Sequence, residues 1–410
     1  MRILVISNLY PPAQIGGYEV LCAEAVKCLA ERHEITVLTS NRLGVPSEPG
    51  IVRELAYLPD GRRSALRAPA AALHAAKVTR RVLAEVRPEL VFVWNGAAMP
   101  QTAIRIAEQS GAVVAYSVCQ GWFEGLYAGN DLFMRELTPA GAHPGWGQAM
   151  RLVNRHPSLR LDLRTRVPAS ICWVSEAMKR LVPIPPTVEP LEQRVIYTGV
   201  HDPDLWTSVE RRPPSGRPQI LFVGRLEREK GPDVAYRALA ALRERHGIEA
   251  DLVLAGRPND EMAALLAPLG RELGISERLR LLGQVSPQRV AELMGESSAI
   301  VVPSVWDEPS GGICLEAGLA RIPVAASRAG GMPEGLLEEE HALYFPIADH
   351  DSCADQLARL LRSPDETAAR AARAYERAQA FTFDHYMERM NEFVDAAVAA
   401  GRSDAVGSAA

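Results

Sequence analysis

The second half of the chain opens with the stretch Gln219-Ile-Leu-Phe-Val-Gly-Arg-Leu-Glu-Arg-Glu-Lys-Gly231. Its apolar run at 220–223 is followed by a glycine, a charged loop and, from Pro232, a segment with apolar residues at helical spacing. Such a run is typical of a strand that is buried on both faces of a parallel sheet. The stretch therefore predicts a strand, a polar loop and a helix, which is the repeating unit of an α/β domain.

The same pattern of a strand followed by a helix recurs on both sides of this stretch. In the first half the expected strands are residues 2–7, 34–40, 89–95, 112–118, 170–175 and 194–199. In the second half they are residues 219–224, 250–256, 279–285, 299–304, 323–327 and 342–346. Residues 183–218 are rich in proline, and we interpret them as a linker that contains the strand at 194–199. The pattern predicts two α/β domains with parallel sheets, whose ligands bind at the carboxyl ends of the strands.

The length of 410 residues is also typical of two domains. We expect an amino-terminal domain at residues 1–200 and a carboxyl-terminal domain at residues 201–380. A helix at 355–380 is expected to close the second domain, an amphipathic helix at 383–400 to follow it, and residues 401–410 to form a flexible tail.

The composition excludes several classes of protein. Apolar residues make up 47% and charged residues 23%, as in a globular protein with a large core. A net charge of −5 gives no basic field that would hold nucleic acid. The six cysteines show no spacing typical of a zinc site and indicate a reducing, cytoplasmic setting. We expect neither a signal peptide nor a membrane-spanning segment.

Two cations follow the expected strand at 219–224. Arg225 comes directly after Gly224, and Lys230 lies just before the next helix. Arginine offers a planar fork of donors and lysine a mobile point charge, so the pair suits a diphosphate. The alternative is a charged loop that only contacts solvent.

A second motif lies at Pro303-Ser-Val-Trp-Asp-Glu-Pro-Ser-Gly-Gly-Ile-Cys-Leu-Glu-Ala-Gly318. Ser310, Gly311 and Gly312 would expose backbone N–H groups, while Glu308 and Glu316 could accept hydrogen bonds from vicinal hydroxyls. The alternative is that the two acids only complement a helix dipole. Because the motif also follows a strand of the second sheet, we favour the functional interpretation.

Three features of the first half are open to two interpretations each. Gly16-Gly17, before a helix, indicates either an anion site or a tight turn. The segment from Arg62 to Arg87 is a basic amphipathic helix that could bind anionic lipid, or an alanine-rich surface helix with solvated arginines. Residues 120–148 are rich in aromatic side chains, which stack on sugars in an acceptor site or pack in an ordinary loop.

The chain resembles the retaining glycosyltransferases of family 4, which have the GT-B fold. In that fold two Rossmann-like domains with parallel sheets face each other across a deep cleft. The resemblance covers nearly the whole chain, and its most specific part is the pair of glutamates at 308 and 316. It rests on Gly16-Gly17, Val174-Ser-Glu176, Val195-Ile-Tyr-Thr-Gly-Val200, Gly224-Arg225, Lys230-Gly231, Leu254-Ala-Gly256, Leu282-Gly283, Pro303-Ser304, Glu308 with Glu316, Gly330-Gly331 and Pro333-Glu334.

The resemblance implies an enzyme that transfers a hexosyl unit from a nucleoside diphosphate sugar to a hydroxyl with retention. Arg225, Lys230 and Glu308 would be its catalytic residues, the two cations on the diphosphate and the carboxylate on the sugar. The donor-binding residues would be Gly16, Gly17, Gly224, Val285, Ser310, Gly311, Gly312 and Glu316. UDP is the expected nucleotide, with GDP and ADP open, and the resemblance implies neither a cofactor nor a metal. The helix at 383–400 would cross back to the first domain.

The chain departs from the family at a few positions. Cys119-Gln120 stands where many relatives have a His-Asp or similar pair. Gln120, Trp122 and Glu124 are therefore the candidate acceptor-binding residues, for a small-molecule, glycan or lipid-linked acceptor. Two alternatives remain open: a nucleotide-sugar epimerase or hydrolase, which would consume donor without acceptor, and a non-catalytic subunit that binds nucleotide. The sequence predicts a cytoplasmic protein, with peripheral membrane contact through residues 62–87 as one option, and leaves the oligomeric state open.

Overall fold

The computed structural model describes residues 1–59, 62–119, 121–127, 131–138, 145–157 and 159–409. The chain forms two compact units. Unit 1 consists of Met1–Val174, Met178–Ile196 and Met387–Ala410, and unit 2 of Ser175–Ala177 and Tyr197–Tyr386. The main boundary thus lies between Ile196 and Tyr197, where the sequence placed it between residues 200 and 201.

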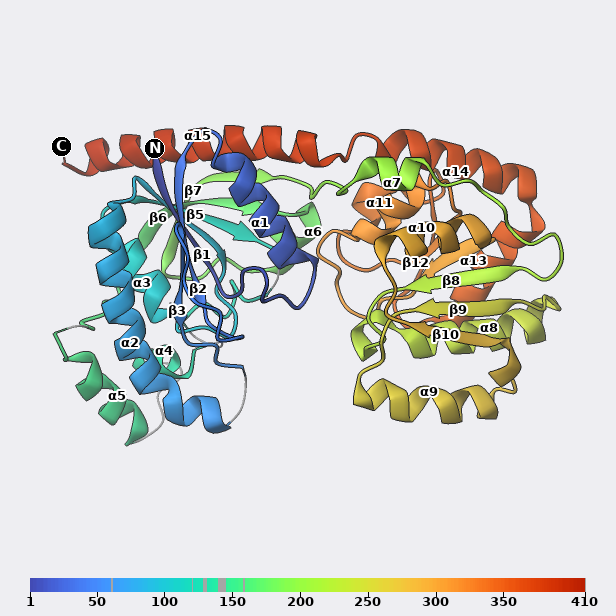
Figure 1. Ribbon diagram of the computed structural model, residues 1–410, viewed down its shortest axis with the longest axis horizontal. Helices are drawn as coiled ribbons and strands as arrows, with labels where there is room; N and C mark the ends of the chain where they lie inside the picture. The colour runs from blue at the N-terminus through green and yellow to red at the C-terminus, as the bar shows by residue number, and fades with distance from the viewer. Residues whose placement is uncertain (60–61, 120, 128–130, 139–144, 158, 410) are drawn as a thin grey trace. The chain divides into compact units, whose positions relative to one another are not determined.

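Unit 1 is built on a seven-stranded sheet in the order β3-β2-β1-β4-β5-β6-β7 (Figure 1). All neighbouring strands in it are parallel. The strands are β1 (Arg2–Ser7), β2 (Glu34–Ser40), β3 (Ile51–Leu55), β4 (Leu90–Asn95), β5 (Val113–Val118), β6 (Val167–Trp173) and β7 (Val188–Val195).

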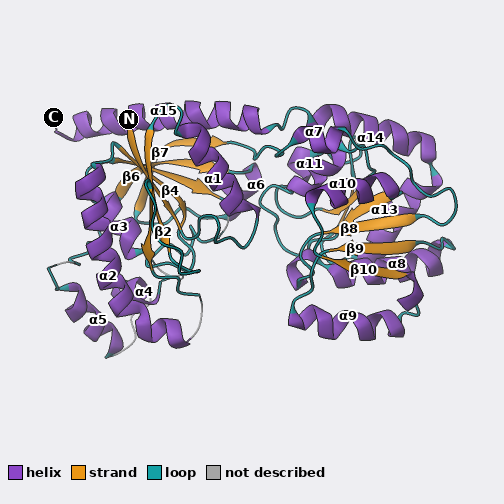
Figure 2. Ribbon diagram, in the orientation of Figure 1, coloured by secondary structure: helices purple, strands orange, loops and turns teal. Residues whose placement is uncertain are grey.

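Helices cover both faces of this sheet (Figure 2). Leu4 and Ile6 of β1 point into a core that α2, α3, α4 and α5 complete. On the opposite face, Phe92 of β4 contacts Phe393 of α15, with ring centroids 6.2 Å apart. The helices are α1 (Gly17–Leu29), α2 (Arg62–Val86), α3 (Thr102–Glu108), α4 (Leu132–Leu137), α5 (Trp146–Asn154), α6 (Glu176–Leu181) and α15 (Phe383–Ala409). Because the inner strands β1, β4 and β5 are buried on both sides, they read as continuous apolar runs.

Unit 2 is built on a six-stranded parallel sheet in the order β10-β9-β8-β11-β12-β13. Its strands are β8 (Gln219–Val223), β9 (Asp251–Ala255), β10 (Leu279–Gly283), β11 (Ala299–Val302), β12 (Val324–Ser327) and β13 (Leu343–Phe345). Residues of β8 alternate between two cores: Ile220 and Phe222 pack with α8, α9 and α13. Leu221 packs on the other face with α10, α11 and α14.

The helices of unit 2 connect these strands and close the unit. They are α7 (Pro203–Thr207), α8 (Pro232–His246), α9 (Asp260–Glu272), α10 (Pro287–Glu296), α11 (Gly312–Leu319), α12 (Met332–Gly335), α13 (His350–Arg362) and α14 (Pro364–Ala378), with short 3₁₀ helices η1 (Arg228–Lys230) and η2 (Ser276–Arg278). No helix of the described residues is both long and apolar enough to cross a membrane.

Several expected elements need correction. The strand β3 was not predicted. The strand expected at 194–199 within the linker lies earlier, at Val188–Val195, and is β7, an edge strand of unit 1. The single helix expected at 355–380 is two helices, because the chain breaks at Ser363 before Pro364. The expected flexible tail at 401–410 is wrong as well, since α15 continues to Ala409.

Each sheet has one switch point, which is the place where two neighbouring strands are not consecutive in the sequence and the connections that follow them run to opposite faces of the sheet. In unit 1 it lies between β1 and β4, and in unit 2 between β8 and β11. Loops after the carboxyl ends of the two strands splay apart at such a point, and ligands of open α/β sheets usually bind there. In unit 2 these loops are residues 224–231 and 303–311, which carry the cations and the first part of the glutamate motif.

Candidate functional site

A pocket of about 260 Å³ lies at the switch point of unit 2. Its walls come from the end of β8, the end of β11, the loop before α11 and the first turns of α11. The lining residues are Phe222, Val223, Gly224, Lys230, Val302, Pro303, Ser304, Glu308, Gly311, Gly312, Ile313 and Glu316. Residues from two separate sequence motifs, at 224–230 and at 303–316, therefore meet in one pocket.

One glycine allows these segments to approach each other, and a second allows the segment 303–316 to approach α12. Gly231 has φ of 65°, and a Cβ there would collide with the carbonyl of Pro303. Gly311 has φ of 65°, and a Cβ would collide with the side chain of Met332. Left-handed backbone of this kind favours glycine. The amide of Val305 donates to the carbonyl of Glu229 over 2.8 Å, which joins the loops directly.

Glu308 is the centre of the polar contacts in the pocket. Its Oε1 accepts hydrogen bonds from Lys230 Nζ at 2.6 Å, Ser304 Oγ at 2.5 Å and Trp306 Nε1 at 3.0 Å. The Glu308 side chain is 9% exposed and that of Lys230 is 25% exposed. The backbone of Glu308 is fixed as well, because its carbonyl accepts the amide of Gly331 at 2.7 Å. The Glu308 carboxylate and the Lys230 ammonium are thus held together in the pocket that the start of α11 also lines.

Glu316 lies in α11 and lines the same pocket. Burial raises the pKa of its carboxyl from the ordinary 4.5 to about 7. Desolvation disfavours the charged form, and no stronger cause offsets it. Near neutral pH this carboxyl therefore exchanges readily between an acceptor-only form and a form that can also donate.

Three of the predicted donor-binding or catalytic residues that belong to unit 2 do not line the pocket. The guanidinium of Arg225 follows Gly224 but pairs with Glu227, and its side chain is 44% exposed. Ser310 Oγ accepts a hydrogen bond from Thr198 Oγ1 at 3.1 Å. Val285 packs, half-buried, against the core beneath α10 and α11. The pocket thus brings together Lys230, Glu308, Gly224, Gly311, Gly312 and Glu316 among the predicted residues.

The predicted glycine loop of unit 1 is arranged differently. The amide of Gly16 donates to Glu19 Oε2 over 3.0 Å, so a carboxylate of the chain itself caps the start of α1. Glu19 is buried. Gly16 has an extended backbone with φ of −145°, and a Cβ on Gly16 or Gly17 would meet no atom within 4 Å. The Gly16 amide is therefore engaged by Glu19, whereas no such acid caps the loop at Gly311.

The candidate acceptor residues separate in the structure. Trp122 is 4% exposed, and its ring lies edge-on to Phe123 with centroids 5.7 Å apart. The interpretation of Trp122 as a stacking surface for an acceptor is therefore wrong, because its ring belongs to the core of unit 1. Glu124 is exposed, and Gln120 lies outside the described residues. Among the other aromatic side chains here, Phe123, Tyr127 and Phe133 are buried too, while Trp146 is 46% exposed.

The basic segment from Arg62 to Arg87 forms α2 and the turn after it. The side chains of α2 that face the core are Ala68, Ala72, Ala75, Ala76, Val78 and Val82. Arg67, Lys77, Arg80 and Arg81 are exposed. Arg81 pairs with Glu54 at 2.6 Å, and Arg80 donates to the carbonyl of Leu159 at 3.1 Å. Part of the basic face is thus engaged by unit 1 itself.

Sequence reasoning missed the roles of Ser304 and Trp306, which hold Glu308 in place. Both lie within the motif at 303–318, so its polar side chains were the available signal. Within the described ranges, no group of three or more His, Cys, Asp or Glu residues is arranged to hold a metal ion.

Comparison with known proteins finds a family match within unit 2. Residues 207–378 match the family model of glycosyl transferases group 1. The chain is 35% identical over 208 residues to a D-inositol 3-phosphate glycosyltransferase of Mycolicibacterium paratuberculosis, which covers 48% of this chain and 46% of that protein. The chain thus matches about half the length of that curated relative. The expected resemblance to glycosyltransferases is confirmed.

Solved structures show the fold of the whole chain. Sucrose-phosphate synthase from Thermosynechococcus elongatus superposes with a TM-score of 0.70 at 18% identity, covering 97% of this chain and 99% of that one. HepE of Anabaena, solved in complex with UDP, superposes with a TM-score of 0.65 at 17% identity, covering 97% and 100%. The predicted GT-B fold, with two Rossmann-like parallel sheets, is confirmed.

Proposed function

We propose that this chain, whose residues 207–378 match the glycosyl transferases group 1, is a retaining glycosyltransferase. It transfers a hexosyl unit from a nucleoside diphosphate sugar to an acceptor hydroxyl. The single observation that carries the proposal is the pocket at the switch point of unit 2. It joins Lys230, Glu308, the Gly311-Gly312 loop and Glu316, which together match the charges and hydroxyls of such a donor.

In the proposed complex Lys230 neutralises the diphosphate. Its side chain is only 25% exposed, and its ammonium already faces an anion, the Glu308 carboxylate at 2.6 Å. The diphosphate would replace Glu308 as the partner of Lys230, next to the first turn of α11, where N–H groups and the helix dipole favour an anion. Arg225, at the end of β8, would leave Glu227 and add a second cation.

Glu308 and Glu316 would hold the two polyhydroxyl parts of the donor. When Lys230 moves to the diphosphate, Glu308 keeps the hydrogen bonds from Ser304 and Trp306 and gains capacity to accept from a sugar hydroxyl. Glu316 would accept from the ribose hydroxyls, and binding there favours its ionised form because hydrogen bonds stabilise a carboxylate. Val285 would act at most indirectly, since it packs against the core.

Retention follows from attack on the same face as the leaving diphosphate. The acceptor oxygen bonds to the anomeric carbon as the bond from that carbon to the phosphate oxygen breaks, and the acceptor proton passes to the leaving diphosphate. Negative charge grows on the diphosphate in this step. Lys230 and Arg225 would stabilise that charge more strongly in the transition state than in the bound donor, which is what accelerates the reaction.

The nucleotide and the acceptor are proposed from two separate observations. UDP is favoured because HepE of Anabaena, which shares the fold, was solved with UDP. The acceptor is assigned to unit 1, where Glu124 is exposed after β5. Metal-independent transfer is part of the same proposal. So is peripheral contact of the exposed cations of α2 with an anionic membrane, because a basic helix face attracts anionic lipid.

The donor is tested by thermal unfolding with UDP, GDP, ADP and TDP sugars, since a ligand of the native state raises the melting temperature. Transfer is then measured to D-inositol 3-phosphate, D-glucose and octyl glucoside, with and without EDTA, and NMR gives the anomeric configuration of the product. We expect UDP sugars to stabilise the protein, transfer with retention, and no effect of EDTA. Consumption of donor without acceptor would instead indicate an epimerase or hydrolase.

A matched pair of variants ties the activity to the pocket. Glu308→Gln removes a charge inside the pocket, and Glu229→Gln removes one from an exposed side chain in the neighbouring loop. We expect Glu308→Gln to reduce transfer by about 100-fold or more, as for loss of a group that acts in the transition state. Equal activity of the two variants would contradict the proposed function.

A further inference from the structure

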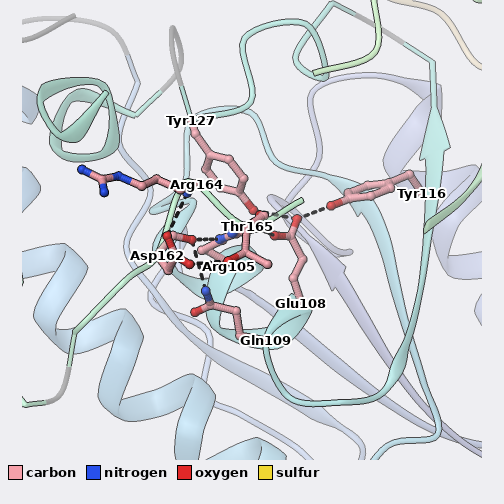
Figure 3. Close-up of polar contacts among 8 residues, drawn as sticks. All are labelled: Arg105, Glu108, Gln109, Tyr116, Tyr127, Asp162, Arg164 and Thr165. Carbon is pink, nitrogen blue, oxygen red and sulfur yellow. Dashed lines mark hydrogen bonds and ion pairs between the residues drawn. The ribbon is translucent and has the colours of Figure 1, made fainter. Parts of the chain in front are cut away.

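A buried carboxylate in unit 1 is shared by two tyrosines from different segments. Figure 3 shows Tyr127 and Tyr116 pointing toward Glu108 of α3 from two sides. Tyr127 Oη donates to Glu108 Oε1 at 2.7 Å, and Tyr116 Oη of β5 donates to the same oxygen. Tyr116 lies in the sheet, whereas Tyr127 belongs to the segment between β5 and α4, of which residues 121–127 are called the loop here. Glu108 thus links this loop to the core.

Arg105 completes the link, because all three nitrogens of its guanidinium group donate hydrogen bonds. Its Nη1 donates to Glu108 Oε2 at 2.8 Å, its Nε to the carbonyl of Asp162 at 2.6 Å and its Nη2 to that of Thr165 at 2.7 Å (Figure 3). The side chains of Arg105 and Glu108 are 0% and 1% exposed. A buried ion pair is weak evidence for stability, because desolvation offsets most of the attraction. A role in holding one particular arrangement of loops fits it better.

The backbone of Tyr127 is fixed from a second side. Its backbone N–H donates to Gln101 Oε1 at 2.7 Å. The backbone N–H of Gln101 in turn donates to Asp131 Oδ2 at 2.7 Å. Tyr127 has φ of 64°, a left-handed conformation that is strained in a residue other than glycine. Such strain persists only where surrounding contacts determine it, and it gathers at ligand clamps. The hydroxyl and the amide of Tyr127 are therefore both anchors of the loop.

The anchored loop has a buried side and an open side. Trp122 and Phe123 pack into the core of unit 1, while Gly121 and Glu124 are exposed. The loop follows β5, so it lies at the carboxyl edge of the sheet, where α/β folds bind ligands. Glu124 is thus a carboxylate on a short segment whose far end is held in one conformation by Gln101 and Glu108.

We infer that Tyr127, Glu108 and Arg105 are positioning residues that fix the loop 121–127 so that Glu124 accepts a hydrogen bond from the acceptor. The inference rests on the proposed function. It deepens that function by naming Glu124 as the residue that accepts a hydrogen bond from a hydroxyl of the acceptor. Tyr127 acts through the loop, not by contact with the acceptor, because its hydroxyl is consumed by Glu108.

The chain offers a matched pair for the test. Tyr127→Phe and Tyr116→Phe each remove one hydroxyl from the same oxygen of Glu108, but only Tyr127 belongs to the loop. KM is measured for whichever of D-inositol 3-phosphate, D-glucose and octyl glucoside the wild type glycosylates. We expect Tyr127→Phe to raise the acceptor KM about tenfold, which is the effect of losing a hydrogen bond to a charged group such as the Glu124 carboxylate. Tyr116→Phe should leave it within about twofold, and the donor KM should stay constant in both.

A double variant shows whether Tyr127 acts through Glu124. Glu124→Gln alone should raise the acceptor KM. Adding Tyr127→Phe should raise the KM little further, because both changes remove the same contact, the one between Glu124 and the acceptor. Fully multiplicative effects, or equal effects of the two tyrosine variants, would overturn the inference.

Hydrogen exchange separates this inference from the proposed function. Amides of the loop 121–127 should exchange faster in Tyr127→Phe and not in Tyr116→Phe, a result that needs no substrate. Unchanged exchange would overturn the anchoring itself. A wild type that transfers to no acceptor, with exchange as expected, would contradict the proposed function and the acceptor role of Glu124 while leaving the anchor in place.

Discussion

The two units repeat one topology, yet their switch points hold different chemistry. In each unit a pair of glycines stands at the start of a helix: Gly16-Gly17 at α1 in unit 1, and Gly311-Gly312 at α11 in unit 2. In unit 2 the neighbouring loop supplies Lys230. In unit 1 the acid Glu19, from the first turn of α1, caps the helix itself.

Because the two sheets share their strand order around the switch point, the difference between the sites lies in the loop residues. A helix start favours anions because of its free N–H groups and its dipole. Glu19 meets that preference from within the chain, so α1 offers less to an external phosphate than α11 does. Lys230 has the opposite effect, since it places a cation where a diphosphate can reach it.

The largest effect is expected from removing the cation. Lys230→Met should lower kcat/KM for transfer by about 100-fold or more, because the charge of the leaving diphosphate loses its nearest partner. Arg228→Met is the matched control: it lies in the same loop with a side chain that is 81% exposed. Steady-state kinetics and melting temperature are measured for both. Similar loss in the two variants would remove the distinction between the pocket and its surface loop.

Substituting the glycines tests the backbone of the two loops. Gly311→Ala forces a side chain into left-handed backbone and against Met332, and should destabilise unit 2 by about 1–3 kcal/mol. Gly16→Ala meets open space and extended backbone, so its melting temperature should remain close to that of the wild type. Calorimetric unfolding compares them. A larger loss from Gly16→Ala would mean that the unit 1 loop is the constrained one.

The pH dependence of stability tests the burial of Glu316. Its pKa is raised to about 7, so between pH 4.5 and 7 the folded state binds more protons than the unfolded state. Stability should therefore fall as pH rises through this window and level off above it. Glu316→Gln should lose that part of the fall, by a few degrees in melting temperature. Identical pH profiles for both proteins would show that the carboxyl is well solvated.

The smallest effect is expected at the cap of α1. Glu19→Gln keeps a hydrogen-bond acceptor for Gly16 but removes the charge at the helix start, a change of about 0.3–1 kcal/mol. The KM for the donor should stay within about twofold. A tenfold change in that KM would mean that unit 1 binds the nucleotide as strongly as unit 2 does.

Much of the fold was readable because buried parallel strands are continuous apolar runs. β3 (Ile51–Leu55) escaped because it contains Arg53, whose burial depends on tertiary contacts with the carbonyls of Tyr10 and Pro11. The strand predicted at 194–199 was placed too late, because Pro190 and several charges interrupt the first part of β7 (Val188–Val195), as an edge strand tolerates. Local pattern carries no information about such partners.

The candidate site was predicted in part for the same reason. Lys230, Glu308 and Glu316 follow strand ends, so their residue type and position were sufficient to bring them together. Trp122 was wrongly placed in an acceptor site, because aromatic content does not tell a packed loop from an open one. The pairing of Lys230 with Glu308, and the hold of Glu108 on Tyr127, depend on side chains far apart in the sequence and needed the structure.

The central claim is that the switch point of unit 2 holds the nucleoside diphosphate. A crystal structure of the protein with UDP tests it most directly. The account predicts diphosphate oxygens within hydrogen-bonding distance of Lys230 Nζ, the ribose hydroxyls on Glu316, and Lys230 no longer paired with Glu308. UDP bound elsewhere, with the Lys230–Glu308 pair intact and the pocket empty, would contradict the claim.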